Sequence, residues 1–320
     1  MANSPQPISA RMGAAEWAIL TLLAVLWGGA FFFIEVALAG VPPITLVLVR
    51  MTLAALLLYV AMRLMGQRLP GGWRVWRALF LLGLLNNALP FMLYAWGQMA
   101  ITGGLASILN ATTPLWAVVV AHLLTDDEKA TPGKVAGVLL GIVGVVVMVG
   151  GDALAGLGDA LVAQIACLVG ALSYALASVQ ARGFRAMGVR PMALATGQSI
   201  TAAALLLPVA LIVETPWRLP MPGVSVVAAL LGLAIFSTTF AYVLYFRLLE
   251  TAGATNSLLV TFLIPITAIL LGTLVLGERV EPGQLIGMAL IALGLAAIDG
   301  RPWAWLTRRR QPLAPPPPRP

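Results

Sequence analysis

Polar and aromatic side chains recur at helical spacing inside two apolar stretches of this sequence. Each set follows steps of four, three and four residues, which places its members on one face of a helix. The first set is Asn87, Phe91, Tyr94 and Gln98, and the second is Thr238, Tyr242, Tyr245 and Leu249. Polar side chains inside hydrocarbon are costly and face a cavity or another helix. Amide, hydroxyl and aromatic groups in this pattern predict non-covalent binding of a small molecule.

The same reasoning extends the predicted cavity to polar and aromatic residues of neighbouring helices. The residues that we expect to bind a substrate are Trp27, Asn86, Asn87, Phe91, Tyr94, Gln98, Asn110, Gln164, Tyr174, Thr238, Thr239, Tyr242, Tyr245 and Asn256. For any one of the polar residues, a hydrogen bond between two helices is the alternative interpretation. The prediction of a cavity therefore depends on the set as a whole.

Two charged residues, Glu35 and Arg50, lie inside predicted helices at a similar depth. Glu35 precedes Gly40 by five residues and Arg50 follows Pro43 by seven, so both are about 7 to 10 Å from the nearer membrane boundary. An unpaired charge at this depth is costly, and we therefore expect a structural or gating ion pair. The alternative is that Glu35 carries a coupled proton. Because the cavity itself then has no net charge, a strongly anionic substrate such as a sugar phosphate is disfavoured.

The sequence offers little for covalent or metal chemistry. It has one histidine, His122, and one cysteine, Cys167, whereas a zinc site takes several such ligands. An enzyme would need a nucleophile and a base within reach of each other. A glycine-rich phosphate loop with its Lys-Ser/Thr pair is missing from the sequence. We therefore predict no metal, no cofactor and no enzymatic activity, with energy from a gradient rather than from ATP.

The composition shows what surrounds these residues. Of the 320 residues, 60% are hydrophobic and 10% are charged, and the mean hydropathy is +0.97, whereas about a quarter of a soluble domain is charged. A helix needs about 20 apolar residues to cross a bilayer. Ten runs of about that length cover residues 17–39, 44–64, 77–99, 104–124, 132–150, 158–180, 191–213, 224–247, 254–276 and 282–299. The predicted fold class is an all-α integral membrane protein with ten transmembrane helices.

Basic residues are distributed unequally between the two ends of these helices. If successive helices cross in alternate directions, every Lys and Arg except Arg50, Arg218 and Arg279 falls on the side of the N-terminus. The positive-inside rule then predicts that both termini are cytoplasmic. The net charge of +7 follows from this asymmetry, so we expect no nucleic-acid partner. Residues 301–320 are predicted to form a basic, proline-rich cytoplasmic tail that faces anionic lipid.

The sequence repeats itself after about 150 residues. The segment KATPGKVAGVLLGIVG at 129–144 corresponds to RVEPGQLIGMALIALG at 279–294. Pro132, Gly137 and Gly144 coincide with the same residue types in the second segment at a constant offset. A match of this kind predicts a duplicated structural unit.

The two predicted repeats are residues 1–151 and 152–300, with five helices each. Because five is odd, the second repeat enters the membrane from the opposite side, which predicts inverted repeats around a central cavity. The spacing of Gly133, Gly137 and Gly141 predicts close helix packing. The packing partner is either the other repeat or a second protomer of a homodimer.

Four segments within about residues 15–300 carry a further pattern, namely LAVLWGGAFFF, PPITLVLVRMTLAALLL, SILNATTPLWAVVVAHLLTDDEKATPGKVAGVLLGIVGVVVM and LLVTFLIPITAILLGTLVLGERVEPGQLIGMALIALGL. Through them the chain resembles the drug/metabolite transporter superfamily, and specifically its EamA-type ten-helix carriers. The first repeat departs from the family pattern, because LTDDEK stands where the second repeat has LGER. The resemblance implies an exporter of amino acids or related small metabolites in the bacterial inner membrane.

Together these observations favour a secondary transporter that exports small zwitterionic metabolites, in particular apolar or aromatic amino acids, by alternating access. Aromatic rings also bind cations, so an efflux carrier for several cationic drugs is the alternative within transporters. An intramembrane enzyme or a scaffold is the alternative from a different class. The expected partners are a small-molecule substrate and the lipid bilayer, and a homodimer is left open.

Overall fold

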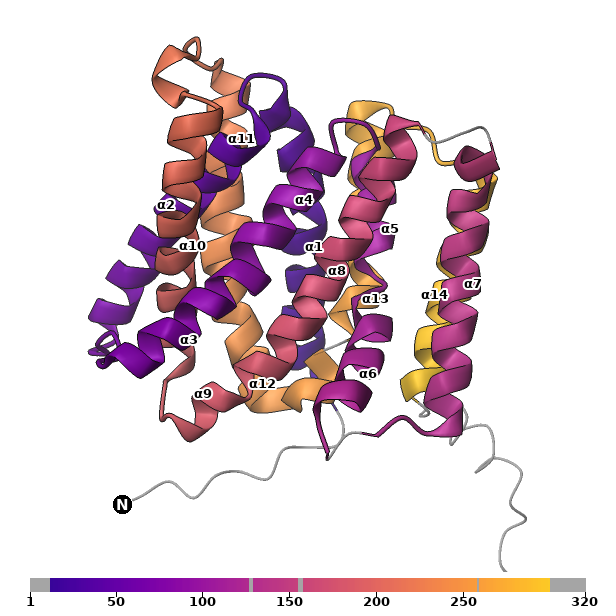
Figure 1. The fold of residues 1–320 in the computed structure, drawn as a ribbon, viewed down its shortest axis with the longest axis horizontal. Helices are drawn as coiled ribbons and strands as arrows, with labels where there is room; N and C mark the ends of the chain where they lie inside the picture. Colours follow the sequence, from indigo (N-terminus) through magenta and orange to yellow (C-terminus); the bar gives the residue numbers. More distant parts are fainter. Residues whose placement is uncertain (1–11, 127–128, 155–157, 258, 300–320) are drawn as a thin grey trace, which may run out of the picture.

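The structure of this protein is a computed structural model that describes residues 12–126, 129–154, 158–257 and 259–299. This part of the chain is a bundle of helices without strands (Figure 1). Within it, nine helices are long and apolar enough to cross a membrane, and Val260–Leu276 is a shorter apolar helix at the position of the remaining span. The all-α membrane fold is thus confirmed. The predicted tail 301–320 lies outside the described residues.

The helices follow the predicted order of spans. The first five spans are α1 (Ala14–Leu38), α2 (Pro43–Leu64), α3 with α4 (Trp73–Gly83 and Leu89–Gly97), α5 with α6 (Gly103–Asn110 and Thr113–Leu124) and α7 (Pro132–Leu154). The second five are α8 (Asp159–Ala181), α10 (Pro191–Val213), α11 with α12 (Val224–Ala234 and Ala241–Ser257), α13 (Val260–Leu271) and α14 (Pro282–Asp299), and the short α9 (Gly183–Ala186) joins α8 to α10. Proline, which suits the first turn of a helix, begins α2, α7, α10 and α14 at matching places in both repeats.

The last helices of the two repeats, α7 and α14, lie side by side and run in opposite directions. A methyl group at Gly137 would lie 2.5 Å from the carbonyl oxygen of Gly294, and one at Gly287 would lie 2.6 Å from that of Gly144. In the repeat, Gly137 corresponds to Gly287 and Gly144 to Gly294. The contact therefore maps onto itself when the repeats are exchanged, as a two-fold relation requires. The repeats are inverted, as predicted.

The other helices of each repeat also pack on helices of the opposite repeat. Helix α10 contacts α2 and α3, while α2 in turn contacts α10 and α11. Likewise, α1 of the first repeat packs on α13, and its counterpart α8 of the second repeat packs on α6. In Figure 1, α7 and α14 stand at one edge of the bundle. The remaining spans are the ones that can enclose a central space.

Wide π-helical turns interrupt the third and eighth spans at equivalent positions. They are η1 (Leu84–Ala88), between α3 and α4, and η3 (Ile235–Phe240), between α11 and α12. In η3 the hydroxyl groups of Thr238 and Thr239 donate to carbonyl oxygens five residues earlier, each at 2.8 Å. Single π-turns occur frequently at functional sites. Both turns carry amide or hydroxyl residues of the predicted binding set.

The helical path is also broken near the fourth and ninth spans. Ala111 and Thr112 separate α5 from α6, and the backbone of Gly253 leaves the helical region within α12, with a φ of 79°. Beside the first break, the hydroxyl of Thr113 donates to the carbonyl of Asn110 at 2.7 Å. The first break lies within the fourth span, and discontinuous helices of this kind border the substrate sites of many transporters. Gly253 lies at the end of the eighth span, before α13 begins.

Carboxylates of the second repeat close the face at which α2 and α5 begin. Glu214, which follows α10, accepts hydrogen bonds from the N–H groups of Ile44 and Thr45 at 2.9 and 2.6 Å and from the Thr45 hydroxyl at 2.7 Å. Glu278 accepts from the first two N–H groups of α5, each at 3.3 Å. Because negative groups stabilise helix N-termini, these two carboxylate caps tie the repeats together at this end.

Candidate substrate-binding cavity

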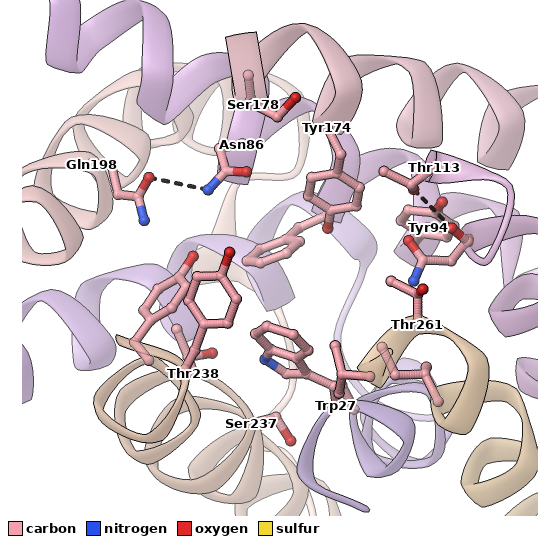
Figure 2. A pocket seen from close by; sticks show the side chains of 18 of the residues that line it. Trp27, Asn86, Tyr94, Thr113, Tyr174, Ser178, Gln198, Ser237, Thr238 and Thr261 are labelled. Atoms are coloured by element: carbon pink, nitrogen blue, oxygen red, sulfur yellow. Dashed lines mark hydrogen bonds between the residues drawn. The ribbon is translucent and has the colours of Figure 1, made fainter. Parts of the chain in front are cut away.

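A cavity of about 440 Å³ lies between the two repeats (Figure 2). Its described lining comes from every span except those of α7 and α14. The predicted residues that line it are Trp27, Arg50, Asn86, Phe91, Tyr94, Asn110, Tyr174, Thr238, Tyr242 and Tyr245. The polar and aromatic stripes of the two repeats thus meet at one space. Its volume is in the range of small-molecule sites.

Aromatic side chains are in mutual contact in the cavity wall. The ring centroids of Trp27 and Tyr245 are 5.4 Å apart. Tyr94 stacks on Tyr174 at 6.2 Å with 17° between the ring planes, and Phe91 meets Tyr174 at 6.4 Å in an edge-to-face arrangement. Such pairs are favourable beyond the area that they bury. The wall therefore presents apolar ring faces to a bound molecule, and contacts between the rings hold these faces in place.

The predicted ion pair between Glu35 and Arg50 is wrong. Arg50 is 4% exposed and lines the cavity. Its Nε donates to the Thr238 hydroxyl at 2.9 Å, and its guanidinium lies 3.9 Å from the centroid of the Phe91 ring. Equal depth on adjacent helices does not fix the direction of a side chain around the helix axis. The cavity consequently contains a positive charge, which corrects the expectation that it has none.

The repeat counterpart of Arg50 is Gln198, 148 residues further along the chain. The side-chain oxygen of Gln198 accepts a hydrogen bond from Asn86 Nδ2 at 3.1 Å, drawn as a dashed line in Figure 2. Arg50 thus binds the π-turn of the second repeat through Thr238, and Gln198 binds that of the first through Asn86. We name these pairs the arginine latch (Arg50 and Thr238) and the glutamine latch (Gln198 and Asn86).

Five of the predicted binding residues lie outside the described cavity lining, namely Asn87, Gln98, Gln164, Thr239 and Asn256. Asn87 is fully buried and donates to the Tyr242 hydroxyl at 3.0 Å, which is the interhelical bond of the alternative interpretation. The π-turn explains the shift, because residues five apart are stacked in such a turn. Asn86, five residues before Phe91, therefore lines the cavity in place of Asn87.

The lining also includes polar and aromatic residues beyond the fourteen predicted to bind a substrate. Five of them share the helical stripes of that set and follow from the same pattern, namely Phe31, Thr113, Ser178, Ser257 and Thr261. Three others, Gln198, Ser237 and Phe246, lie on none of the predicted stripes. Gln198 could have been found from the repeat, because it matches Arg50. Thr113 and Thr261 follow Asn110 and Ser257 by a few residues, next to the helix breaks. Ser237 could not be found from a regular helical period, because it lies within a π-turn.

Glu35 is partly buried and lies outside the described cavity lining. Its Oε2 atom is buried and has no hydrogen-bond partner among the residues that the structure describes. The carboxylate of Glu278, which caps α5, acts on it electrostatically. A role of Glu35 in coupling or gating stays a prediction.

His122 and Cys167 take no part in the described cavity lining. The Nδ1 atom of His122 accepts a hydrogen bond from the N–H of Ala130 at 3.2 Å, near the end of α6. Cys167 is fully buried in a hydrophobic cluster with residues of several spans. In the described ranges, His, Cys, Asp and Glu side chains form no group that could hold a metal ion.

Several known proteins are similar to this chain over most of its length. It is 25% identical over 291 residues to the uncharacterized inner membrane transporter YedA of Escherichia coli, with 87% of this chain and 89% of that protein covered. It is 27% identical over 277 residues to protein PecM of Dickeya dadantii, with 85% and 88% covered. It is also 27% identical over 307 residues to a probable terminal-alkyne amino-acid exporter of Streptantibioticus cattleyicolor, with 95% and 99% covered.

The fold is shared with a protein of known crystal structure. The TM-score is 0.64 at 22% sequence identity, with 94% of this chain and 100% of the other covered. Residues 15–150 and 161–298 each match the same family model, that of the EamA-like transporters. Because these two matches include most of the sequence and both halves of the cavity, this chain belongs to the EamA-like transporter family.

Proposed function

We propose that this transporter exports small zwitterionic metabolites, in particular apolar or aromatic amino acids, by alternating access. The observation that carries the proposal is the lining of the cavity, where aromatic rings, amides and hydroxyls surround one guanidinium. Rings suit an apolar side chain, and a guanidinium suits a carboxylate. A relative that is named a probable amino-acid exporter supports the same substrate class. The positive charge of Arg50 argues against the alternative of cationic drugs.

The two ends of the cavity differ in the way that alternating access requires. At one end, the lining residues Ile34, Arg50 and Tyr94 are 3, 4 and 3% exposed, and the two carboxylate caps of α2 and α5 lie at that end. Toward the other end, the lining includes Ser178, which is exposed. A cavity that is closed on one side and open on the other supports one of the two states of a carrier.

We place the open end in the cytoplasm of a bacterial cell, with the chain in the inner membrane and both termini inside. Ser178 lies near the end of α8, on the face where α1 and α10 begin (Figure 1). Basic residues of the sequence gather on this side, which the positive-inside rule assigns to the cytoplasm. In this state the carrier would take up its cargo from the cell interior.

Transport in proteoliposomes tests the proposed function. Vesicles that contain the purified chain and internal unlabelled phenylalanine or leucine should exchange it for external labelled amino acid, and empty vesicles should not. A cationic dye should neither enter the vesicles nor inhibit the amino-acid exchange. Uptake of the dye without exchange of any amino acid would establish the cationic-drug alternative instead.

Cysteine labelling tests the orientation of the cavity. We expect Ser178→Cys to react with a membrane-impermeant maleimide in inside-out vesicles and not in right-side-out vesicles. Phenylalanine in excess should slow the reaction, because the side chain lines the cavity. Ala186→Cys, which is exposed on the same side of the membrane beyond the end of α8 and outside the described lining, is the matched control and should react without protection. Reaction from the outside alone would reverse the assignment.

Proton coupling through Glu35 requires its own test. We expect Glu35→Gln to retain amino-acid exchange between two equal solutions, because Glu35 lies outside the described lining. Accumulation driven by a pH gradient should be lost if Glu35 carries the proton. Gradient-driven accumulation at the wild-type rate in this variant would exclude coupling through Glu35.

A further inference from the structure

We propose that the cavity recognises its cargo through a carboxylate bound to Arg50, and that the amino group of an amino acid is not required. The inference rests on the proposed function, because it names the substrate class of the same cavity. It is more specific than the proposed function, because it states which chemical group of the cargo is required. Arylalkanoic acids that lack an amino group bind, and amines of the same size that lack a carboxylate do not.

Two contacts hold the guanidinium of Arg50 and leave its outer edge available. Nε donates to the Thr238 hydroxyl at 2.9 Å, and that hydroxyl donates to the carbonyl of Leu233 at 2.8 Å. The Phe91 ring covers one face of the guanidinium at 3.9 Å. Among the described residues, the two Nη nitrogens have no hydrogen-bond acceptor in the protein. These nitrogens form a planar pair of donors that matches the two oxygens of a carboxylate.

The charge of Arg50 lacks a negative partner in the part of the chain that is described. No salt bridge is formed by Arg50 there, and none of the described lining residues is Asp or Glu. A buried cation in a membrane protein is costly without such a partner, and the contact with Phe91 offsets only part of the cost. A carboxylate on the cargo supplies the missing charge. A cationic cargo instead adds repulsion.

The amino group of a cargo finds only neutral partners in the same lining. Asn110 and Thr113 offer amide and hydroxyl groups beside the break between α5 and α6, and Trp27 and Tyr245 offer ring faces. Hydrogen bonds to these neutral groups largely replace those that the ammonium group already makes to water, whereas the carboxylate of a cargo pairs with a full positive charge. Removing the amino group therefore changes binding less than removing the carboxylate.

Three probes with one carbon skeleton test this inference on the purified full-length chain. They are phenylalanine, 3-phenylpropionate and 2-phenylethylamine, which carry both charged groups, the carboxylate alone and the amine alone. Calorimetric titration in detergent should give dissociation constants for the first two within about fivefold of each other, and binding of the amine should be at least about 30-fold weaker. In proteoliposomes, 3-phenylpropionate should inhibit phenylalanine exchange at lower concentration than the amine.

Arg50→Gln is the decisive variant, because Gln is the residue that the second repeat has at the equivalent position, Gln198. It should weaken binding of 3-phenylpropionate by about 30-fold and remove the preference over 2-phenylethylamine. Arg50→Lys keeps the charge and loses the planar pair of donors. It should still prefer 3-phenylpropionate over 2-phenylethylamine, with an affinity between those of the wild type and Arg50→Gln. This variant tests the inference even if Arg50→Gln does not fold. Arg63→Gln, at the exposed end of the same helix, removes a charge outside the cavity and should bind all probes as the wild type does.

The outcomes separate this inference from the proposed function. Stronger binding of 2-phenylethylamine than of 3-phenylpropionate, or equal binding of 3-phenylpropionate to wild type and Arg50→Gln, overturns carboxylate recognition and leaves amino-acid export standing. Absence of phenylalanine exchange overturns the proposed function. In that case the titrations still decide the inference, because 3-phenylpropionate either requires Arg50 for binding or does not.

Discussion

The arginine latch and the glutamine latch occupy equivalent positions in the two repeats and differ in charge. Each joins the second helix of one repeat to the π-turn of the other, at 2.9 Å between Arg50 and Thr238 and at 3.1 Å between Asn86 and Gln198. The backbone arrangement is thus shared, whereas the side-chain chemistry is not. The pseudo-two-fold relation therefore shapes the cavity, whereas the charge in its described lining comes from the first repeat alone.

Away from the cavity, the two repeats are alike in their side chains as well. Where α7 meets α14, the close contacts on both sides of the two-fold relation are made by glycines. We therefore expect equivalent substitutions to change stability equally at this contact, where both repeats have glycine. At the latches, where the side chains differ, we expect unequal changes. Three sets of variants examine this contrast.

Gln198→Arg should have the largest effect. It places a second buried cation in the cavity without a negative partner, so we expect the free energy of unfolding to fall by about 3 kcal/mol or more. Adding Arg50→Gln to the same chain restores a single cation and should recover most of this loss. Thermal unfolding in detergent of the wild type, both single variants and the double variant measures the coupling. Strictly additive losses would show that the two latches do not share one electrostatic environment.

The equivalent substitutions Gly137→Ala and Gly287→Ala should each lower the free energy of unfolding by about 2 kcal/mol, because crowding in a close helix contact is destabilising. The added methyl groups would lie 2.5 and 2.6 Å from a carbonyl oxygen of the opposite helix. Gly133→Ala on the same helix is the control, because its methyl group would have no neighbour within 4 Å. Thermal unfolding compares all three. A large loss at only one of the two equivalent positions would contradict the two-fold contact.

Thr238→Val and Asn86→Leu each break one latch and should have the smallest effects. Loss of the hydrogen bond to the charged Arg50 should lower the free energy of unfolding by about 1.5 kcal/mol or more. Loss of the neutral hydrogen bond to Gln198 should lower it by about 1 kcal/mol. Thr238→Val should also weaken 3-phenylpropionate binding more than Asn86→Leu does, because Thr238 orients the guanidinium. Calorimetric titration of both variants gives the comparison. A greater loss of binding in Asn86→Leu would place the carboxylate at the glutamine latch.

The spans, the repeats and the paired stripes could be predicted because their signals are local or periodic in the sequence. Apolar runs give the spans, and the constant offset of Pro132 and Gly137 from their counterparts gives the duplication. An odd number of spans then gives the inversion without any knowledge of contacts. For the same reason, Tyr94 and Tyr245 were correctly predicted to line one cavity.

The direction of individual side chains could not be predicted in the same way. The α-helical period selects Asn87, whereas the wide turn η1 brings Asn86 to the cavity. Such a turn has no simple sequence signature in this chain. Likewise, depth along the helices suggested that Arg50 pairs with Glu35, but rotation about the helix axis places Arg50 beside Thr238. Both errors concern rotation about an axis, which only tertiary packing determines.

The glycine contact between α7 and α14 has the form of a homodimer interface within one polypeptide. Gly137 meets Gly294, and the counterparts of these residues meet each other in turn. Two separate five-helix chains could form the same interface, provided that they entered the bilayer in opposite orientations. Fusion into a single polypeptide guarantees one copy of each orientation. It also allows a residue such as Arg50 to change in one copy while the other remains neutral.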